Sequence, residues 1–143
     1  MNIEDTQQAI IADFSAFDDW MDKYTYLIEL GNELEPIDAS YKIDQKLIRG
    51  CQSRVWLQQK LEGDLLIFEA ESDALIVKGL VALLLKVFSG RTPQEILDAE
   101  PYFIDEIGLR QHLSPTRSNG LMAMVKQIKL YALAYKQIAS LKK

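Results

Sequence analysis

The chain has 143 residues, of which 48% are hydrophobic and 26% are charged, a mixture typical of one globular domain over residues 1–143 and not of disordered or collagen-like sequence. The net charge is −5, from 21 acidic and 16 basic residues, which argues against a nucleic-acid-binding protein, since such proteins are normally basic. The chain has one cysteine, Cys51, and one histidine, His112. These counts exclude an internal disulfide and a multi-cysteine zinc or iron–sulfur centre within one chain, and they make other transition-metal sites poor.

The N-terminus lacks the basic start and apolar run of a signal peptide. The most apolar stretch, residues 74–88, is shorter than the roughly 20 residues that a membrane-spanning helix needs. Lys78 and Lys86 also interrupt it. We therefore expect a soluble protein of the reduced cytoplasm, with no membrane partner.

Charge is unevenly distributed along the chain. Residues 1–38 carry ten acids against Lys23 alone, residues 114–143 carry six cations and no acid, and residues 42–60 carry five cations against Asp44. One interpretation is that the two ends pack as oppositely charged helices. The other is that the cations around Cys51 favour its thiolate or attract a partner.

The first 38 residues predict two helices. Asp5 or Thr6 is suited to cap a helix that runs to about Phe17, with apolar residues on one face. Asp18 and Asp19 interrupt this pattern and are suited to cap a second helix, which the pair at 35–36, Glu-Pro, ends.

The middle of the chain changes to the period of β-strands. Residues 54–60 and 65–69 predict two strands joined across 62–64, and a shorter strand at 46–49 precedes them. Gly50 and Cys51 then lie in the connection between the first and second strands. The sheet is therefore predicted to be small, antiparallel and about three-stranded.

Helices return after the sheet. Ser72 or Asp73 is expected to cap the apolar segment 74–88, which we predict to be a central buried helix. Thr92, with Pro93 and Glu95, predicts a capping box, and residues 114–115, Ser-Pro, start the last helix. The last helix is expected to expose its lysines, which are Lys126, Lys129 and Lys136. Its buried stripe is expected to consist of Leu121, Met124, Val125, Ile128, Tyr131, Tyr135 and Ile138. The fold class is α+β, a small sheet packed against several helices.

Cys51 is the residue with the clearest chemistry. Its neighbours Arg49 and Arg54 are cations that favour a thiolate, the reactive form of cysteine. Gly50 permits a tight backbone conformation, and Ser53 can donate a hydrogen bond to an anion on the sulfur. A lone cysteine is also a common buried apolar residue, and spacing alone leaves the two interpretations about equal.

The segment 50–56, Gly-Cys-Gln-Ser-Arg-Val-Trp, resembles the signature of the SufE family, which includes the closely similar CsdE proteins. Four further segments agree in order and spacing: Trp20 with 23–24 and 28–31, 72–80, 92–93, and 111–121 with its Gln-His-Leu, Pro115, Arg117 and Gly120. The resemblance spans roughly residues 14 to 130.

This resemblance implies a sulfur acceptor of iron–sulfur cluster assembly. Such proteins take sulfur from a pyridoxal-phosphate-dependent cysteine desulfurase of the SufS or CsdA type, carry it as a persulfide on the loop cysteine, here Cys51, and deliver it to a SufBCD-like scaffold. They also raise the turnover of the desulfurase. The pyridoxal phosphate belongs to the partner, so this chain needs no cofactor. The family favours a monomer or weak homodimer, and it keeps this cysteine among apolar side chains at rest, with Gly50 a plausible hinge.

Other residues of the resembling segments are candidates for supporting the loop. They are Gly50, Gln52, Ser53, Arg54, Asp73, His112 and Arg117. Asp73 is better explained as a helix cap than as a loop contact, and Arg117 equally well as part of a salt bridge. Trp56 is expected in the core, and His112 is expected to be structural.

Two other functions remain as alternatives. A stand-alone thiol enzyme, a hydrolase or a peroxide-reducing protein, would use Cys51 with a paired histidine such as His112 or with a resolving cysteine. An interaction domain would leave the thiol inert.

Overall fold

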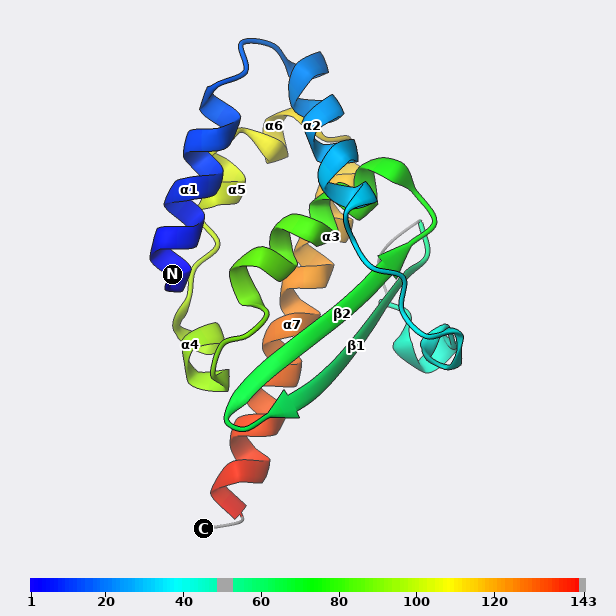
Figure 1. The fold of residues 1–143 in the computed structure, drawn as a ribbon, viewed down its shortest axis with the longest axis vertical. Coiled ribbons are helices and arrows are strands. Elements are labelled where there is room, and N and C mark those ends of the chain that lie inside the picture. The colour runs from blue at the N-terminus through cyan, green and yellow to red at the C-terminus, as the bar shows by residue number, and fades with distance from the viewer. Residues whose placement is uncertain (49–52, 142–143) are drawn as a thin grey trace.

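The computed structural model describes residues 1–48 and 53–141, and Figure 1 shows the arrangement of their helices and strands. The elements in chain order are α1 (Ile3–Ser15), α2 (Trp20–Asn32), the 3₁₀ turns η1 (Ala39–Tyr41) and η2 (Asp44–Lys46), β1 (Val55–Glu62), β2 (Leu65–Ser72), α3 (Leu75–Phe88), α4 (Pro93–Asp98), α5 (Phe103–Glu106), α6 (Leu109–His112) and α7 (Pro115–Leu141). This confirms an α+β fold with a small antiparallel sheet against helices.

The helix starts follow local capping rules, with one correction near the N-terminus. Asp19 caps α2 as predicted, and Thr92 and Glu95 form the predicted capping box of α4. The predicted cap at Asp5 or Thr6 is wrong, because α1 begins at Ile3 and the side chain of Asn2 accepts a 2.7 Å hydrogen bond from the Asp5 N–H. Asparagine is a favourable N-cap residue. Asn2 precedes the apolar pattern that predicts the start of the helix, so the pattern does not select it.

The sheet is a single hairpin of two strands. β1 and β2 pair antiparallel from Val55 with Ser72 to Glu62 with Leu65, and Gly63, with a φ of +64°, supplies the left-handed conformation that the two-residue turn requires. One face of the hairpin is buried, as the alternation of β2 shows at Leu66 and Phe68.

The predicted third strand at residues 46–49 is wrong in the part that the structure describes. The Leu47 N–H donates a hydrogen bond to the Asp44 carbonyl in η2. This N–H therefore closes a turn and does not pair with a neighbouring strand. Leu47 makes only an isolated bridge to Trp56, and the Ile48 N–H donates to the Val55 carbonyl at 2.9 Å. Arg49 lies outside the described residues.

Helix α3 is the centre of the molecule, as its composition predicts. It packs against α2, β2 and α7, as Figure 1 shows, and most of its side chains are buried. Its crossing with α2 depends on glycine, since a Cβ on Gly79 would lie 2.2 Å from the Leu27 carbonyl oxygen and a Cβ on Gly31 would lie 2.7 Å from the Gly79 nitrogen. The absence of both Cβ atoms lets the two backbones touch.

Helix α7 begins behind α3, and its last turns project beyond the hairpin (Figure 1). The predicted stripe is buried from Leu121 to Ile128, but Ile138 is 43% exposed because it lies in that projecting end. The predicted exposure of Lys129 is also wrong, because its ammonium donates hydrogen bonds of 3.0, 3.2 and 2.5 Å to the carbonyls of Ile96, Leu97 and Ala99. These carbonyls lie at the C-terminus of α4, where helical partners run out, although the Ile96 carbonyl also accepts a 3.4 Å hydrogen bond from the Ala99 N–H.

The described residues contain no helix that is both long and apolar enough to cross a membrane.

The predicted packing of the oppositely charged ends is not observed as direct pairing. Among the described residues, no ion pair joins the acidic N-terminal helices to α7. Helix α3 packs against both α2 and α7.

Candidate functional site

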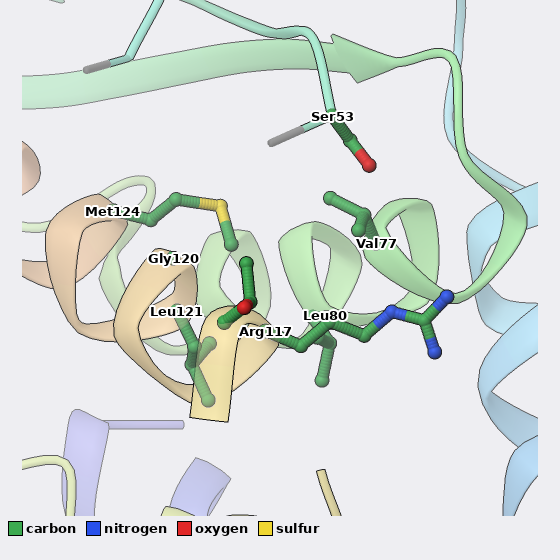
Figure 2. A pocket seen from close by; sticks show the side chains of 8 residues that line it. Ser53, Val77, Leu80, Arg117, Gly120, Leu121 and Met124 are labelled. Carbon is green, nitrogen blue, oxygen red and sulfur yellow. The ribbon is translucent and has the colours of Figure 1, made fainter. Parts of the chain in front are cut away.

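A small cavity of about 90 Å³ lies beside Ser53, the first described residue after Cys51. Its wall comes from three parts of the chain, as Figure 2 shows: the segment before β1, helix α3 and the first turns of α7. The lining residues are Ser53, Val77, Leu80, Thr116, Arg117, Gly120, Leu121 and Met124. The cavity is therefore apolar on the helix side, with two hydroxyl groups and a guanidinium among its lining residues.

The residues of the signature divide into described and undescribed ones. Cys51, Gly50 and Gln52 lie outside the described residues, so their predicted roles stay predictions. Ser53 is half-buried and lines the cavity. Because consecutive Cα atoms are about 3.8 Å apart, the Cα of Cys51 is within roughly 8 Å of the Cα of Ser53.

Asp73 holds the segment that follows Cys51. Its carboxylate accepts a 3.1 Å hydrogen bond from the Arg54 N–H, and its own N–H donates to the Arg54 carbonyl at 3.3 Å. The predicted helix cap is therefore wrong: the N-cap of α3 is Ala74, without a side-chain cap bond. Asp73 instead contacts Arg54, three residues after Cys51, and its predicted contact with the Cys51 loop itself stays a prediction.

The segment before Cys51 is anchored as well. The carboxylate of Glu71 on β2 accepts a 3.1 Å hydrogen bond from the Ile37 N–H and forms an ion pair with Lys42. The Lys42 ammonium also lies over the ring of Trp56, 5.8 Å from its centroid, so Trp56 is a half-buried contact and not a core residue. Together with the hydrogen bond from the Ile48 N–H to β1, these contacts hold in place the segment that ends at residue 48.

Arg117 lies at the cavity, on the first turn of α7. Its backbone N–H donates to the Ser114 hydroxyl at 3.3 Å, which caps the helix as predicted. Among the described residues no carboxylate lies within ion-pair distance of its guanidinium, so the salt-bridge interpretation is not supported. In Figure 2 the side chain extends past Leu80, and it is exposed.

His112 makes its contacts between α6 and α2 and not at the cavity. Its ring stacks on Trp20 at a centroid distance of 4.0 Å, and its Nδ1 lies 3.0 Å from the Gly108 carbonyl. Its own carbonyl accepts a 2.7 Å bond from the Tyr24 hydroxyl. This residue joins α6 to α2 and is not among the residues that line the cavity.

Sequence reasoning missed most of the cavity wall. The apolar pattern assigns Val77 and Leu80 to a helix buried on nearly every side, and Leu121 and Met124 to a core stripe. The only usable signal for Thr116 is its position next to Arg117. Among the described residues, no group of three or more His, Cys, Asp or Glu side chains is placed to hold a metal ion.

The fold and the sequence both have relatives. A solved solution structure of a hypothetical protein from Thermus thermophilus matches with a TM-score of 0.74 over 90% of this chain and 94% of that chain, at 19% identity. That likeness defines the class of fold, an α+β domain with a small sheet against helices. An uncharacterised SufE-like protein of Rhizobium meliloti (strain 1021) is 46% identical over 126 residues, which cover 84% of this chain and 89% of the relative.

The sequence matches a family model over most of its length. The model is SufE, described as "Fe-S metabolism associated domain", and it matches residues 8–132. This chain belongs to the SufE family, as its resemblance predicts, and its function accordingly lies in iron–sulfur metabolism.

Proposed function

We propose that this protein accepts sulfur on Cys51 from a pyridoxal-phosphate-dependent cysteine desulfurase of the SufS or CsdA type and passes it to an iron–sulfur scaffold of the SufBCD kind. Membership of the SufE family carries this proposal. The pyridoxal phosphate resides in the desulfurase, and the chain itself acts as a partner whose one covalent step is at its single cysteine.

The transfer is a thiol exchange that needs no external oxidant or reductant. The Cys51 thiolate attacks the outer sulfur of the desulfurase persulfide; a new sulfur–sulfur bond forms on Cys51, and the old one breaks. The desulfurase cysteine leaves as a thiolate, ready for its next cycle. Removal of this sulfur is the reason that an acceptor stimulates the desulfurase.

The surroundings of Ser53 support this chemistry. Arg54 follows Cys51 by three positions and Arg117 lines the cavity beside Ser53, so both cations would favour the attacking thiolate and the persulfide anion that replaces it. The hydroxyls of Ser53 and Thr116 are donors at the same cavity. Its apolar wall would exclude water from the carried sulfur, which slows its loss to other nucleophiles.

One cysteine without a resolving neighbour also suits a carrier. A second thiol in the same chain would attack the persulfide, form a disulfide and release the sulfur. The chain has no second thiol. A carried sulfur on Cys51 would therefore stay until an external thiol removes it.

Intact mass spectrometry tests the proposal. After incubation with a SufS-type desulfurase and cysteine, we expect the non-reduced protein to gain the mass of one sulfur atom and to lose it on reduction. Cys51→Ser, which preserves size, should gain nothing and should not stimulate the desulfurase. No gain by the parent protein with desulfurases of both the SufS and CsdA types, or full stimulation by Cys51→Ser, would contradict the proposal.

A further inference from the structure

A second recess lies between α4 and α7 and has no part in the chemistry of Cys51. It is a groove of about 360 Å³ whose lining is almost entirely apolar. The lining residues are Leu97 of α4 and Met122, Val125, Lys126, Lys129, Leu130 and Leu133 of α7. Leu130 and Leu133 are 47% and 41% exposed, so two leucines meet solvent side by side on one helix.

The groove lies on the face of α7 opposite the cavity. Met122, Lys126, Lys129 and Leu133 follow a spacing of four, three and four residues, which is one helix face. The cavity residues of α7, from Arg117 to Met124, form another face. At 3.6 residues per turn the two faces are about 160° apart. A protein in the groove therefore leaves the surroundings of Ser53 open.

The charge of α7 defines what can occupy the groove. Residues 115–141 contain four cations and no acid. The Lys129 ammonium is engaged with the carbonyls at the end of α4, and burial lowers its pKa, with the acids Glu100 and Asp98 partly opposing that effect. No carboxylate among the described residues lies within ion-pair distance of Lys126. The groove thus combines an apolar floor with an unmatched cation at its edge.

A second copy of this chain does not fit these requirements. Pairing of α7 with another α7 through the groove would bring Lys126 and Lys129 of both copies together, and α7 has no acid to offset them. The acidic segment, residues 1–38, carries only Met1 and Met21 as exposed large apolar side chains. Its helices therefore have no apolar stripe with which to fill the groove.

We propose that this groove binds an amphipathic helix, with an apolar stripe and acidic flanks, of the protein that receives the sulfur. The inference rests on the proposed function: the desulfurase must reach Cys51 beside Ser53, so a contact on the opposite face of α7 is available to the recipient while loading takes place. Helix-in-groove binding of this kind uses a few leucine-sized anchors for affinity and flanking charges for selection.

The experiment compares three single variants in a reconstituted system of desulfurase, cysteine and a SufBCD-type scaffold. Leu133→Asp places a negative charge in the groove, and Lys126→Glu reverses the cation at its edge. Ile138→Asp is the matched control, because Ile138 is 43% exposed on the same helix but does not line the groove. Thermal unfolding checks that each variant is folded.

We expect Leu133→Asp to weaken binding to the scaffold at least about tenfold and Lys126→Glu to weaken it about fivefold with a smaller dependence on salt, while Ile138→Asp binds like the parent. All three variants should still load one sulfur on Cys51. Because loading and scaffold binding are measured separately, failure of the parent to load while Leu133→Asp still weakens scaffold binding would refute the proposed function and leave the groove contact standing.

Several outcomes would overturn the groove proposal. They are equal scaffold affinity of Leu133→Asp and Ile138→Asp, absence of scaffold binding by the parent, and loss of loading in folded Leu133→Asp, which would assign the groove to the desulfurase. A mass in light scattering that rises with concentration for the parent and Ile138→Asp, but not for Leu133→Asp, would assign it to a second copy.

Discussion

The contact between Asp73 and Arg54 makes a quantitative prediction about access to Cys51. The side chain of Asp73 contributes one hydrogen bond, of 3.1 Å, to the Arg54 N–H, and the backbone contributes the reciprocal bond of 3.3 Å. Asp73→Ala removes only the first. Because residues 49–52 are followed directly by this anchored segment, loss of the bond should favour states in which the segment has left β2.

The expected size follows from the exposure of the bond. Asp73 and Arg54 are both exposed, so the bond is worth about 1 kcal/mol and not the larger values of buried ionic bonds. A difference of about 1 kcal/mol changes an opening equilibrium about fivefold. Alkylation of Cys51 by iodoacetamide, where it depends on opening, should therefore accelerate about fivefold, and the hydrogen exchange of the Arg54 N–H should accelerate similarly.

Asp73→Asn is the matched control, because an amide oxygen at the same position still accepts the Arg54 N–H. We expect Asp73→Asn to be alkylated at close to the parental rate. If Asp73→Asn and Asp73→Ala accelerated equally, the negative charge near the first turn of α3 would be the active feature, and the hydrogen-bond argument would fail. It would fail equally if folded Asp73→Ala were alkylated at the parental rate.

Two further predictions concern packing and pH. Gly79→Ala should lower the free energy of unfolding by about 3 kcal/mol, because the new Cβ would meet the Leu27 carbonyl, whereas Gly63→Ala, strained but with open space around it, should cost only about 1 kcal/mol in urea unfolding. Burial, and then the Asp13 carboxylate, raise the pKa of Tyr26 above its ordinary value of 10.0, so its contribution to stability is complete below that value and is lost as the pH rises through the higher folded-state pKa. The parent should therefore lose more stability than Tyr26→Phe above pH 10, and parallel pH profiles of the two proteins would refute this.

The features that sequence predicted correctly are those fixed within a few residues. The capping box at Thr92 and Glu95 needs only four residues, and the hairpin turn at Gly63 needs only two. Helix α3 was predictable because its fourteen consecutive residues are mostly apolar, and nine of them are buried. In each case the residues that decide the structure are neighbours in the chain.

The features that sequence missed depend on residues far apart. Asp73 follows the pattern of a helix cap, and only its approach to Arg54, nineteen positions away, gives it another partner. Lys129 has the spacing of a solvent-facing residue, but it lies over the end of α4 and satisfies three carbonyls there. The cavity wall has the same origin, since apolar residues of α3 and α7 look like ordinary core until the two helices cross beside Ser53.

The position of α3 gives the uneven charge of the chain a physical consequence. Opposite charges at the two ends of a sequence are expected to attract, but α3 packs against both α2 and α7, and no ion pair among the described residues crosses it. Two cations of α7 therefore remain available at the surface: Arg117 at the cavity beside Ser53, and Lys126 at the groove on the opposite face. A surface charge without an internal partner is free to act on other molecules. Under the two proposals above, the same helix would serve an anionic sulfur on one face and an acidic protein on the other, while its core stripe stays buried.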